Sequence, residues 1–306
     1  MAGERAEAAG GDAVLKMLVA LLALSLAAPV AAALDPPAWT EPTPPFRVVG
    51  NIYYVGSKGL AAYLIKSPRG LVLLDGTMAE NVPQIERNIA ALGFRLKDVR
   101  LLLNSHAHFD HAAGLAQLKR DSGAKLWASA ADREALETGR PPSITSYGLV
   151  AFPPVKVDGV LTGGKAVRLG GVALTPLITP GHTPGCTTWT MTTVERGRRL
   201  RVVFPCSLTV AGNRLVGNSG YPGIVADFRR TFPLVAALSA DVVLPAHPEG
   251  VDLLGRRTRR DAGDAAAFMM PGVLPKLAAD ARTAFEAELA RQAATPQPTI
   301  SSGLKK

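Results

Sequence analysis

Hydrophobic positions in the first half of the chain form short runs, first at strand spacing and then at helix spacing. Three β-branched or apolar runs lie at residues 46–55, 61–67 and 71–75, with Gly-containing turns at residues 56–59 and 68–70. This pattern predicts a β-meander. Apolar side chains then recur at helical spacing over residues 81–92, and the run at residues 99–103 is typical of a buried strand.

A second round of strands and helices follows in the rest of the chain. We predict strands at residues 125–128, 172–178 and 241–244, a hairpin over residues 186–206, and helices at residues 112–118 and 227–238. A final helix is indicated by one apolar stripe, made of Leu274, Leu277, Ala281, Phe285 and Leu289. Two such rounds predict an α/β fold in which two packed sheets carry helices on their outer faces.

The segment ahead of this domain has a different character. An apolar, Ala-rich run at residues 17–33 is interrupted by Pro29 and ends in an A-x-A sequence. These features favour a cleaved secretory signal over the alternative, a retained membrane anchor. We therefore expect a signal peptide at residues 1–33, a domain at residues 34–292 and a disordered tail at residues 293–306. The mature protein would be periplasmic and would have no membrane anchor.

The charge of the chain requires an interpretation of its own. The net charge is +9, and basic clusters lie at residues 196–201 and 256–260. These clusters lack the interleaved aromatic side chains and the recognisable motif of a nucleic-acid-binding surface. We interpret them as solvated turns and expect no nucleic acid partner. We also expect a monomer.

The only two cysteines, Cys186 and Cys206, fall nearly opposite each other if residues 186–194 and 199–206 form the predicted hairpin. An exported protein meets an oxidising compartment in which a disulfide persists. Directly opposed cysteines often form strained bridges, so two buried thiols are an equally good interpretation.

The chemistry of the chain is concentrated in its five histidines. Three of them lie in the sequence H-x-H-x-D-H, as His106, His108 and His111, directly after the buried strand at residues 99–103. The other two, His182 and His247, follow apolar runs and lie in loops rich in proline and glycine. Taken alone, either of these two would be an ordinary core or surface histidine.

The spacing of the cluster predicts a metal site. His106 and His108 are two residues apart and point to one side of an extended segment, whereas Asp110 and His111 turn elsewhere as the chain enters a loop or helix. One segment is therefore able to serve two neighbouring ions. Imidazole nitrogen and carboxylate oxygen are ligands of zinc, and catalytic zinc sites keep one position open for water.

With these residues the sequence resembles the metallo-β-lactamase superfamily over about residues 39–292, and within it class B enzymes of the third subclass. The resemblance implies an αββα sandwich and two zinc ions per chain. The first ion would be held by His106, His108 and His182. The second would be held by Asp110, His111 and His247.

Residues 39–56 and 204–209, with Gly217, Asn218, Tyr221 and Pro222, strengthen the narrower resemblance. The resemblance implies that Ser207 and Thr209 bind a substrate carboxylate, although two hydroxyl groups that bond to backbone are an equally good interpretation. The amide of Asn213 is a candidate for stabilising an oxyanion, with a turn role as the alternative. Asp75 is a candidate for orienting a ligand imidazole, with a helix cap or turn as the alternative.

Two departures from the wider family narrow the range of expected substrate classes. Relatives that hydrolyse thioesters and phosphodiesters use an aspartate that bridges both metals, in a loop that resembles residues 204–208, where this chain has Cys206 and Ser207. The sequence is therefore a poorer candidate for those reactions. Other lactamase subclasses place a metal-binding cysteine near this point, so Cys206 is a minor alternative ligand.

The resemblance implies hydrolysis of the β-lactam amide bond by a hydroxide bound to two zinc ions, with Asp110 and His111 as catalytic residues and a small β-lactam as substrate. A first alternative is an exported dinuclear hydrolase that acts on lactones or other esters, because the fold and the metal site do not fix the substrate. A second alternative is a zinc-storage protein that uses the same ligands without catalysis.

Overall fold

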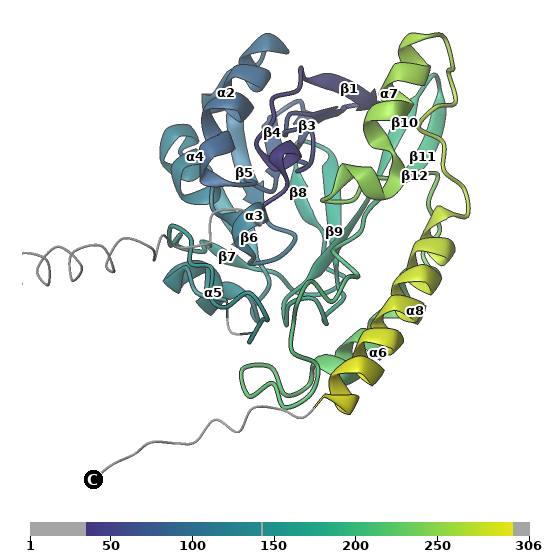
Figure 1. The fold of residues 1–306 in the computed structure, drawn as a ribbon. Coiled ribbons are helices and arrows are strands. Elements are labelled where there is room, and N and C mark those ends of the chain that lie inside the picture. Colours follow the sequence, from purple (N-terminus) through teal and green to yellow (C-terminus); the bar gives the residue numbers. More distant parts are fainter. Residues whose placement is uncertain (1–34, 142, 296–306) are drawn as a thin grey trace, which may run out of the picture. The chain divides into compact units, whose positions relative to one another are not determined.

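The structure is a computed structural model, and it describes residues 35–141 and 143–295 (Figure 1). The predicted signal peptide lies outside the described residues, as do residues 296–306 of the predicted tail. Contacts divide the chain into two units, residues 1–36 and residues 37–306. The account below concerns the second unit. No helix among its described residues is both long and apolar enough to cross a membrane.

The first half of this unit contains seven strands and four α-helices, with three short 3-10 helices between them. In chain order they are η2 (Pro37–Trp39), β1 (Phe46–Val49), β2 (Ile52–Tyr54), β3 (Tyr63–Ser67), β4 (Gly70–Leu74), η3 (Ala79–Asn81), α2 (Val82–Ala91), η4 (Leu96–Asp98), β5 (Val99–Leu103), α3 (Phe109–Ala112), α4 (Leu115–Ser122), β6 (Lys125–Ala128), α5 (Arg133–Thr138) and β7 (Gly159–Val160).

The second half contains the other strands and helices of the described residues. They are β8 (Val167–Leu169), β9 (Val172–Ile178), β10 (Thr187–Glu195), β11 (Arg198–Phe204), α6 (Ile224–Ala236), β12 (Val242–Val243), η5 (Pro248–Val251), α7 (Leu253–Asp261) and α8 (Val273–Ala294).

These strands form two mixed sheets, which confirms the predicted architecture. The first sheet has seven strands in the order β1-β2-β3-β4-β5-β6-β7; β1 to β4 form the predicted meander, and β4 to β7 are parallel. The second has five strands in the order β12-β11-β10-β9-β8, with β12 parallel to β11 and the other pairs antiparallel. Helices α2, α4 and α5 lie beside the first sheet, and α6 and α8 lie beside the second (Figure 1).

Alternation of side chains along the first sheet creates two separate cores, because successive strand residues point to opposite faces. Ile65, Val72 and Leu103 belong to the larger core, which also contains the buried side chains of the second sheet. Their neighbours Leu64 and Leu102 belong to the smaller core beneath helices α2 and α4. Each such fully buried side chain contributes about 1.5–3 kcal/mol, so both layers of helices are held by burial.

The final helix follows the predicted apolar stripe. Leu274 and Phe285 are buried, and the other members of the stripe pack against the same core. The Phe285 ring lies 5.0 Å from that of Phe228 and 5.5 Å from that of Phe232, both of helix α6. The helix extends to Ala294, two residues past the domain boundary predicted at residue 292, and Gln292 is buried.

Local details differ from the sequence predictions. The run at residues 46–55 forms two strands, because Gly50 adopts a φ of +54° at a point where a Cβ atom would lie 2.0 Å from Oγ1 of Thr193. The predicted helix at residues 112–118 is two helices, α3 and α4. The basic cluster at residues 256–260 lies in helix α7 and not in a turn.

Candidate metal centre

Strand β5 delivers the H-x-H-x-D-H segment to one edge of the first sheet. The buried chain continues from Leu103 through Ser105 to helix α3, where Asp110 and His111 lie in a single turn. Two backbone hydrogen bonds fix this path: Asp75 N–H donates to the carbonyl of Leu103 at 2.9 Å, and Thr187 N–H donates to the carbonyl of Ser105 at 2.8 Å. The segment is therefore anchored to both sheets.

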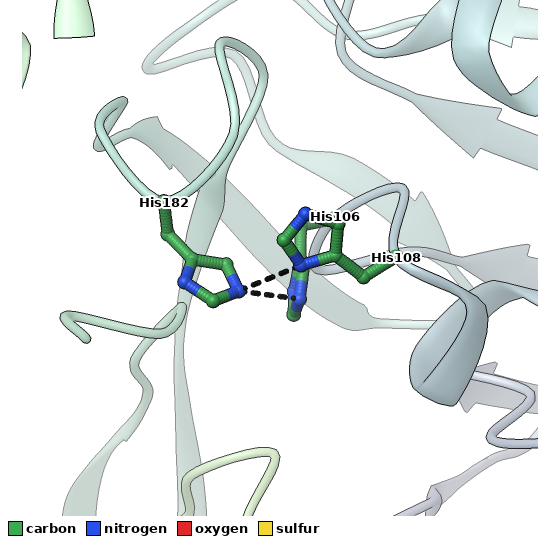
Figure 2. Close-up of side chains that lie close together, drawn as sticks. All are labelled: His106, His108 and His182. Atoms are coloured by element: carbon green, nitrogen blue, oxygen red, sulfur yellow. Dashed lines mark hydrogen bonds between the residues drawn. The ribbon is translucent and has the colours of Figure 1, made fainter. Parts of the chain in front are cut away.

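The first predicted ligand set is brought together from two loops (Figure 2). Nε2 of His182 lies 2.9 Å from Nδ1 of His108 and 3.1 Å from Nε2 of His106. All three side chains are buried. The three ring nitrogens face one another, in a grouping that is able to hold a metal ion.

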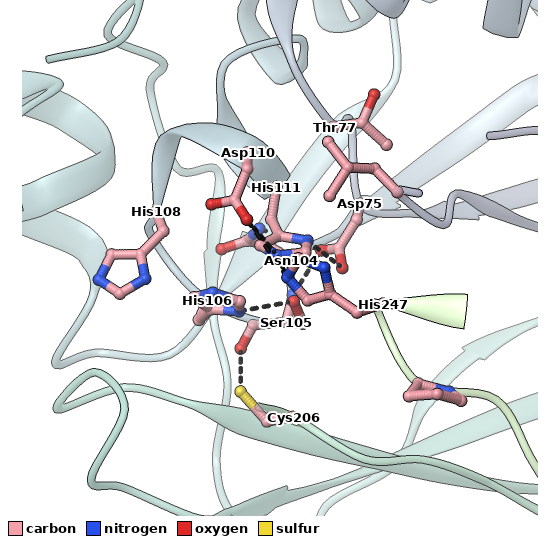
Figure 3. Close-up of polar contacts among 12 residues, drawn as sticks. Asp75, Thr77, Asn104, Ser105, His106, His108, Asp110, His111, Cys206 and His247 are labelled. Atoms are coloured by element: carbon pink, nitrogen blue, oxygen red, sulfur yellow. Dashed lines mark hydrogen bonds and ion pairs between the residues drawn. The ribbon is translucent and has the colours of Figure 1, made fainter. Parts of the chain in front are cut away.

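The second predicted set lies beside the first (Figure 3). Oδ2 of Asp110 is 3.0 Å from Nε2 of His111 and 3.3 Å from Nε2 of His247, and these two nitrogens are 3.2 Å apart. Ligand atoms of His106, Asp110 and His111 all lie within 4.8 Å of one another, so the two sets adjoin. All six predicted ligands are therefore assembled at one place.

Two of the five imidazoles have a hydrogen-bond partner on the side away from the ligand atoms. Nδ1 of His182 lies 2.8 Å from the carbonyl oxygen of Thr209, and Nδ1 of His106 lies 3.0 Å from Oγ of Ser105. Partners of this kind fix the ring orientation and leave the opposite nitrogen free to bind a metal. Nδ1 of His247 and His111 face carboxylates at longer range, Glu249 at 3.5 Å and Asp75 at 3.8 Å.

The electrostatic environment differs between the two sets. Burial, reinforced by the neighbouring histidines, lowers the pKa of His106 and His182 well below the usual value, and burial lowers that of His108 to about 4. Burial also disfavours a charge on His247, but hydrogen bonds to Asp110 and Glu249 outweigh it and raise its pKa to about 9. The charges and hydrogen bonds of the histidines likewise outweigh burial at Asp110 and hold its pKa well below the usual value.

The donor atoms fit divalent metal ions. Imidazole nitrogens that bind one tetrahedral zinc at about 2.0–2.1 Å would lie roughly 3.3 Å apart, close to the observed separations of 2.9 and 3.1 Å. Neutral imidazoles that face one another bring lone pairs together, and a cation between them removes that repulsion. Three nitrogens in one set, and two nitrogens with one carboxylate oxygen in the other, are donor sets that zinc accepts.

The predicted substrate-binding hydroxyls lie at the rim of this centre. Oγ of Ser207 is 3.0 Å from Oγ1 of Thr209, and the carbonyl of Thr209 contacts His182. Ser207 is partly exposed and Thr209 is exposed. Both hydroxyls are thus accessible to solvent next to a ligand of the first set.

Asn213 does not match the prediction that its amide stabilises an oxyanion. The residue is completely buried, and its amide donates to the carbonyls of His182 at 3.1 Å and Val210 at 2.8 Å, while its oxygen accepts from Ser143. Both hydrogens of the amide are therefore engaged by backbone. Asn213 instead ties the His182 loop to the segment at residues 143–146, in agreement with the turn role that was the alternative.

The two cysteines form a disulfide, with their Cα atoms 5.8 Å apart. The sequence left this question open. The ladder of strands β10 and β11 ends at the pair Trp189 and Phe204, and the two cysteines meet just beyond it, one residue out of its register. The bridge engages both sulfurs, which removes Cys206 as an alternative ligand. It also ties the strand after the His182 loop to the segment before Ser207.

Asp75 lies behind His111 and faces its imidazole without a hydrogen bond to it. Its Oδ1 accepts hydrogen bonds from Ser105 N–H at 2.7 Å and from the Asn104 amide at 3.1 Å, and its Oδ2 faces His111. Burial raises the pKa of Asp75, although the charge of His111 opposes this shift. Asp75 does not cap helix η3, which begins after Met78.

Sequence reasoning overlooked Trp39 as part of the site. Its ring lies 5.5 Å from that of His247 and 6.1 Å from that of Phe109, so it borders the second ligand set rather than only covering core. A lone tryptophan in a Pro-rich lead-in carries no spacing signal that would reveal this position.

The sandwich and the two adjoining ligand sets at its edge define a hydrolase that depends on a divalent metal. The family model described as Metallo-beta-lactamase superfamily matches residues 59–247. The chain belongs to this superfamily.

Solved structures of subclass B3 enzymes are similar to the chain over most of its length. BJP-1, a subclass B3 metallo-beta-lactamase of Bradyrhizobium japonicum, is 44% identical, with a TM-score of 0.81 over 84% of this chain and 98% of that one. FEZ-1, the metallo-beta-lactamase from Legionella gormanii, is 36% identical, with a TM-score of 0.79 over 83% and 98%. These similarities confirm the predicted resemblance to the third subclass.

Curated relatives match a shorter part of the chain. A hydroxyacylglutathione hydrolase of Cereibacter sphaeroides is 34% identical over 109 residues, which are 36% of this chain and 36% of that protein. A probable metallo-hydrolase of Burkholderia pseudomallei is 31% identical over 38% of each chain. The chain thus spans little more than a third of the length of these relatives.

Proposed function

We propose that this protein is a zinc-dependent β-lactamase that hydrolyses the amide bond of the β-lactam ring. The observation that carries the proposal is the assembly of His106, His108 and His182 beside Asp110, His111 and His247, in a chain that is 44% identical to a subclass B3 enzyme over almost the whole of that enzyme. A zinc ion bound by each set would lower the pKa of a coordinated water and polarise a carbonyl oxygen.

The residues of the centre have distinct tasks in this reaction. One ion would be held by the three histidines of the first set. A second ion would be held by Asp110, His111 and His247. The carboxylate of Asp110 would accept a hydrogen bond from the attacking water and so orient that water. The reaction needs no covalent nucleophile from the protein.

Two hydroxyl groups supply the anchor for the substrate. Bicyclic β-lactams carry a carboxylate next to the ring nitrogen, and Ser207 and Thr209 are able to donate to it from the exposed rim of the first ligand set. Trp39, which lies against His247, offers an apolar surface beside the second ligand set. The substrate would be held between a polar and an aromatic border.

Segment 204–208 favours β-lactams over thioesters. It supplies no carboxylate, and its cysteine is committed to the disulfide with Cys186. A thioesterase of this superfamily would use an aspartate there to bridge both ions, as the resemblance implies. The hydroxyacylglutathione hydrolases nevertheless match part of the chain, so a glutathione thioester belongs in the test.

We further propose that the mature protein acts as a monomer. We also propose that it is periplasmic, because the apolar run at residues 17–33 has the form of a secretory signal. β-Lactams reach their targets outside the cytoplasm, so export would place the enzyme on their path. Fractionation of cells that express the full chain, with sequencing of the mature N-terminus, tests this proposal.

The proposed activity is tested with a panel of substrates on purified zinc-loaded protein. The panel holds a penicillin, a cephalosporin, a carbapenem, a lactone and a glutathione thioester, each with and without a chelator. We expect hydrolysis of the β-lactams that the chelator abolishes and that zinc restores. Protein that retains two zinc ions and leaves all three β-lactams intact would refute the proposal, and faster hydrolysis of the lactone would favour the first alternative.

A further inference from the structure

A buried carboxylate outside the two ligand sets connects the loops that carry the first set. Asp132 lies at the end of the turn between strand β6 and helix α5 and is almost completely buried. It forms no ion pair with a lysine, arginine or histidine of the described residues. Burying a carboxylate without a cation costs several kcal/mol, so its contacts need to be strong.

The contacts of Asp132 reach both loops. Its Oδ2 accepts a hydrogen bond from Ala107 N–H at 2.9 Å and from Oγ1 of Thr183 at 2.8 Å. Its Oδ1 accepts one from Gly185 N–H at 2.8 Å. Ala107 stands between His106 and His108, and Thr183 follows His182. One side chain therefore binds residues that adjoin the ligands of the first set in both loops.

The local structure favours this arrangement over an ordinary helix cap. Asp132 occupies the N-cap position of helix α5 but makes no side-chain hydrogen bond to that helix. Gly185 packs so closely against the turn that a Cβ atom would lie 2.0 Å from Oγ of Ser129 and 2.5 Å from Cγ of Asp132. The carboxylate thus serves the ligand loops, and a glycine opposite leaves room for it.

We propose that Asp132 is a positioning residue that sets the distance between His182 and the pair His106 and His108, and thereby the affinity of the first metal ion. The inference rests on the metal centre of the proposed function but not on its substrate. It assigns to the chain a residue that acts on the metal through the ligand loops.

Asparagine at this position cannot reproduce the contacts. All three partners of Asp132 donate, so the side chain has to accept at both oxygens. An amide accepts at one atom only and presents hydrogens at the other. In either orientation of the amide, at least one N–H of Ala107 or Gly185 would face another donor, and the two loops would move apart.

The test compares Asp132→Asn with Asp158→Asn as a control. Asp158 is also a carboxylate that accepts a backbone N–H, that of Leu126 in strand β6 at 2.8 Å. Unlike Asp132, it is exposed and pairs with Lys119, and it contacts no ligand loop. For each protein we would measure the affinity of the first zinc by competition with a chelating dye, the visible absorption of the cobalt-substituted protein, and urea unfolding in the presence of a chelator.

For Asp132→Asn we expect the affinity of the first zinc to fall about 10–100-fold, the range for changes to residues that orient metal ligands. The cobalt absorption should change as well. Asp158→Asn should match the wild-type protein in both, whatever it does to urea unfolding. Thr183→Val removes one donor and should show a smaller loss of affinity, which keeps the test available if Asp132→Asn does not fold.

Unchanged zinc affinity and cobalt absorption in Asp132→Asn, or in Thr183→Val if the first variant does not fold, would overturn the inference. An equal loss of affinity in Asp158→Asn would also overturn it, because general destabilisation would then explain the effect. Since these readouts follow metal binding, a failure to hydrolyse β-lactams would count against the proposed function only.

Discussion

The two ligand sets are built from the same kinds of side chain but are held in different ways. The set of His106, His108 and His182 is buried, and a hydrogen-bonded carboxylate ties its two loops together. A disulfide fixes the segment that follows the His182 loop. The second set includes His247, whose side chain is 29% exposed and whose outward nitrogen faces the solvent-exposed Glu249 at 3.5 Å.

We call the set of His106, His108 and His182 the rigid half of the centre. The second set is its accessible half. Burial keeps the first three imidazoles neutral, which is the form that binds metal, whereas the carboxylates around His247 favour its protonated form. We therefore expect the first set to bind its ion more tightly than the second.

The largest effect is expected from His182→Ala. This substitution removes the nitrogen that contacts both His106 and His108, and leaves two ligands in the first set. Hydrolysis should fall by more than about 100-fold, beyond the range for residues that only orient ligands. Zinc content after dialysis and the rate with a β-lactam check this prediction, and a rate within a few-fold of wild type would contradict it.

Loss of the disulfide should lower the stability of the fold around the rigid half. The bridge between Cys186 and Cys206 closes a loop with a sequence separation of 20 residues, for which the chain-entropy model gives about 3 kcal/mol. Replacing both cysteines with serine should lower the free energy of unfolding by about this amount in urea. The control is the wild-type protein with reductant, and equal stability of all three samples would show that the bridge contributes nothing.

His247→Ala should affect the accessible half and spare the rigid half. We expect the protein to retain one equivalent of zinc, and hydrolysis to fall on the order of 10–100-fold, as for weakened rather than abolished metal binding. Metal counting beside the His182→Ala protein gives the comparison. If His247→Ala lost both ions and His182→Ala lost one, the assignment of the rigid half would be reversed.

The smallest effect is expected at the rim. Ser207→Ala removes one hydroxyl that faces the substrate carboxylate and leaves the six ligands in place, so KM should rise by roughly 3–10-fold, the equivalent of about one hydrogen bond, with little change in kcat. Steady-state kinetics on a penicillin measure this change. Ser122→Ala, which removes a buried hydroxyl bonded to the carbonyl of Leu118, is the control, and an equal rise in KM there would exclude a specific role for Ser207.

Much of this architecture could be predicted from the sequence, because residues buried at regular intervals leave a periodic pattern of apolar positions. Strands β5, β6 and β9 have the predicted bounds, and the final helix carries the predicted stripe. The metal ligands were predictable for a related reason: five histidines with one spacing motif leave few other interpretations. The short strands β7 and β8 carry too few residues to form a pattern.

The remaining parts of the site depend on contacts between distant loops. Asp132 lies in an ordinary turn, and its role emerges only when the His182 loop folds against it. Asn213 lies in a sequence that is typical of a turn. Burial of its amide decided between the two proposed roles. Trp39 reaches His247 across more than 200 positions of sequence, a separation that no local pattern records.

The central claim is most directly tested by adding zinc back to chelator-treated protein while both bound metal and hydrolysis of a β-lactam are followed. We predict two classes of binding, the tighter one lost in His182→Ala and the weaker one lost in His247→Ala, with hydrolysis that rises as zinc binds. Stoichiometric binding of two zinc ions with no hydrolysis of any penicillin, cephalosporin or carbapenem would contradict the account.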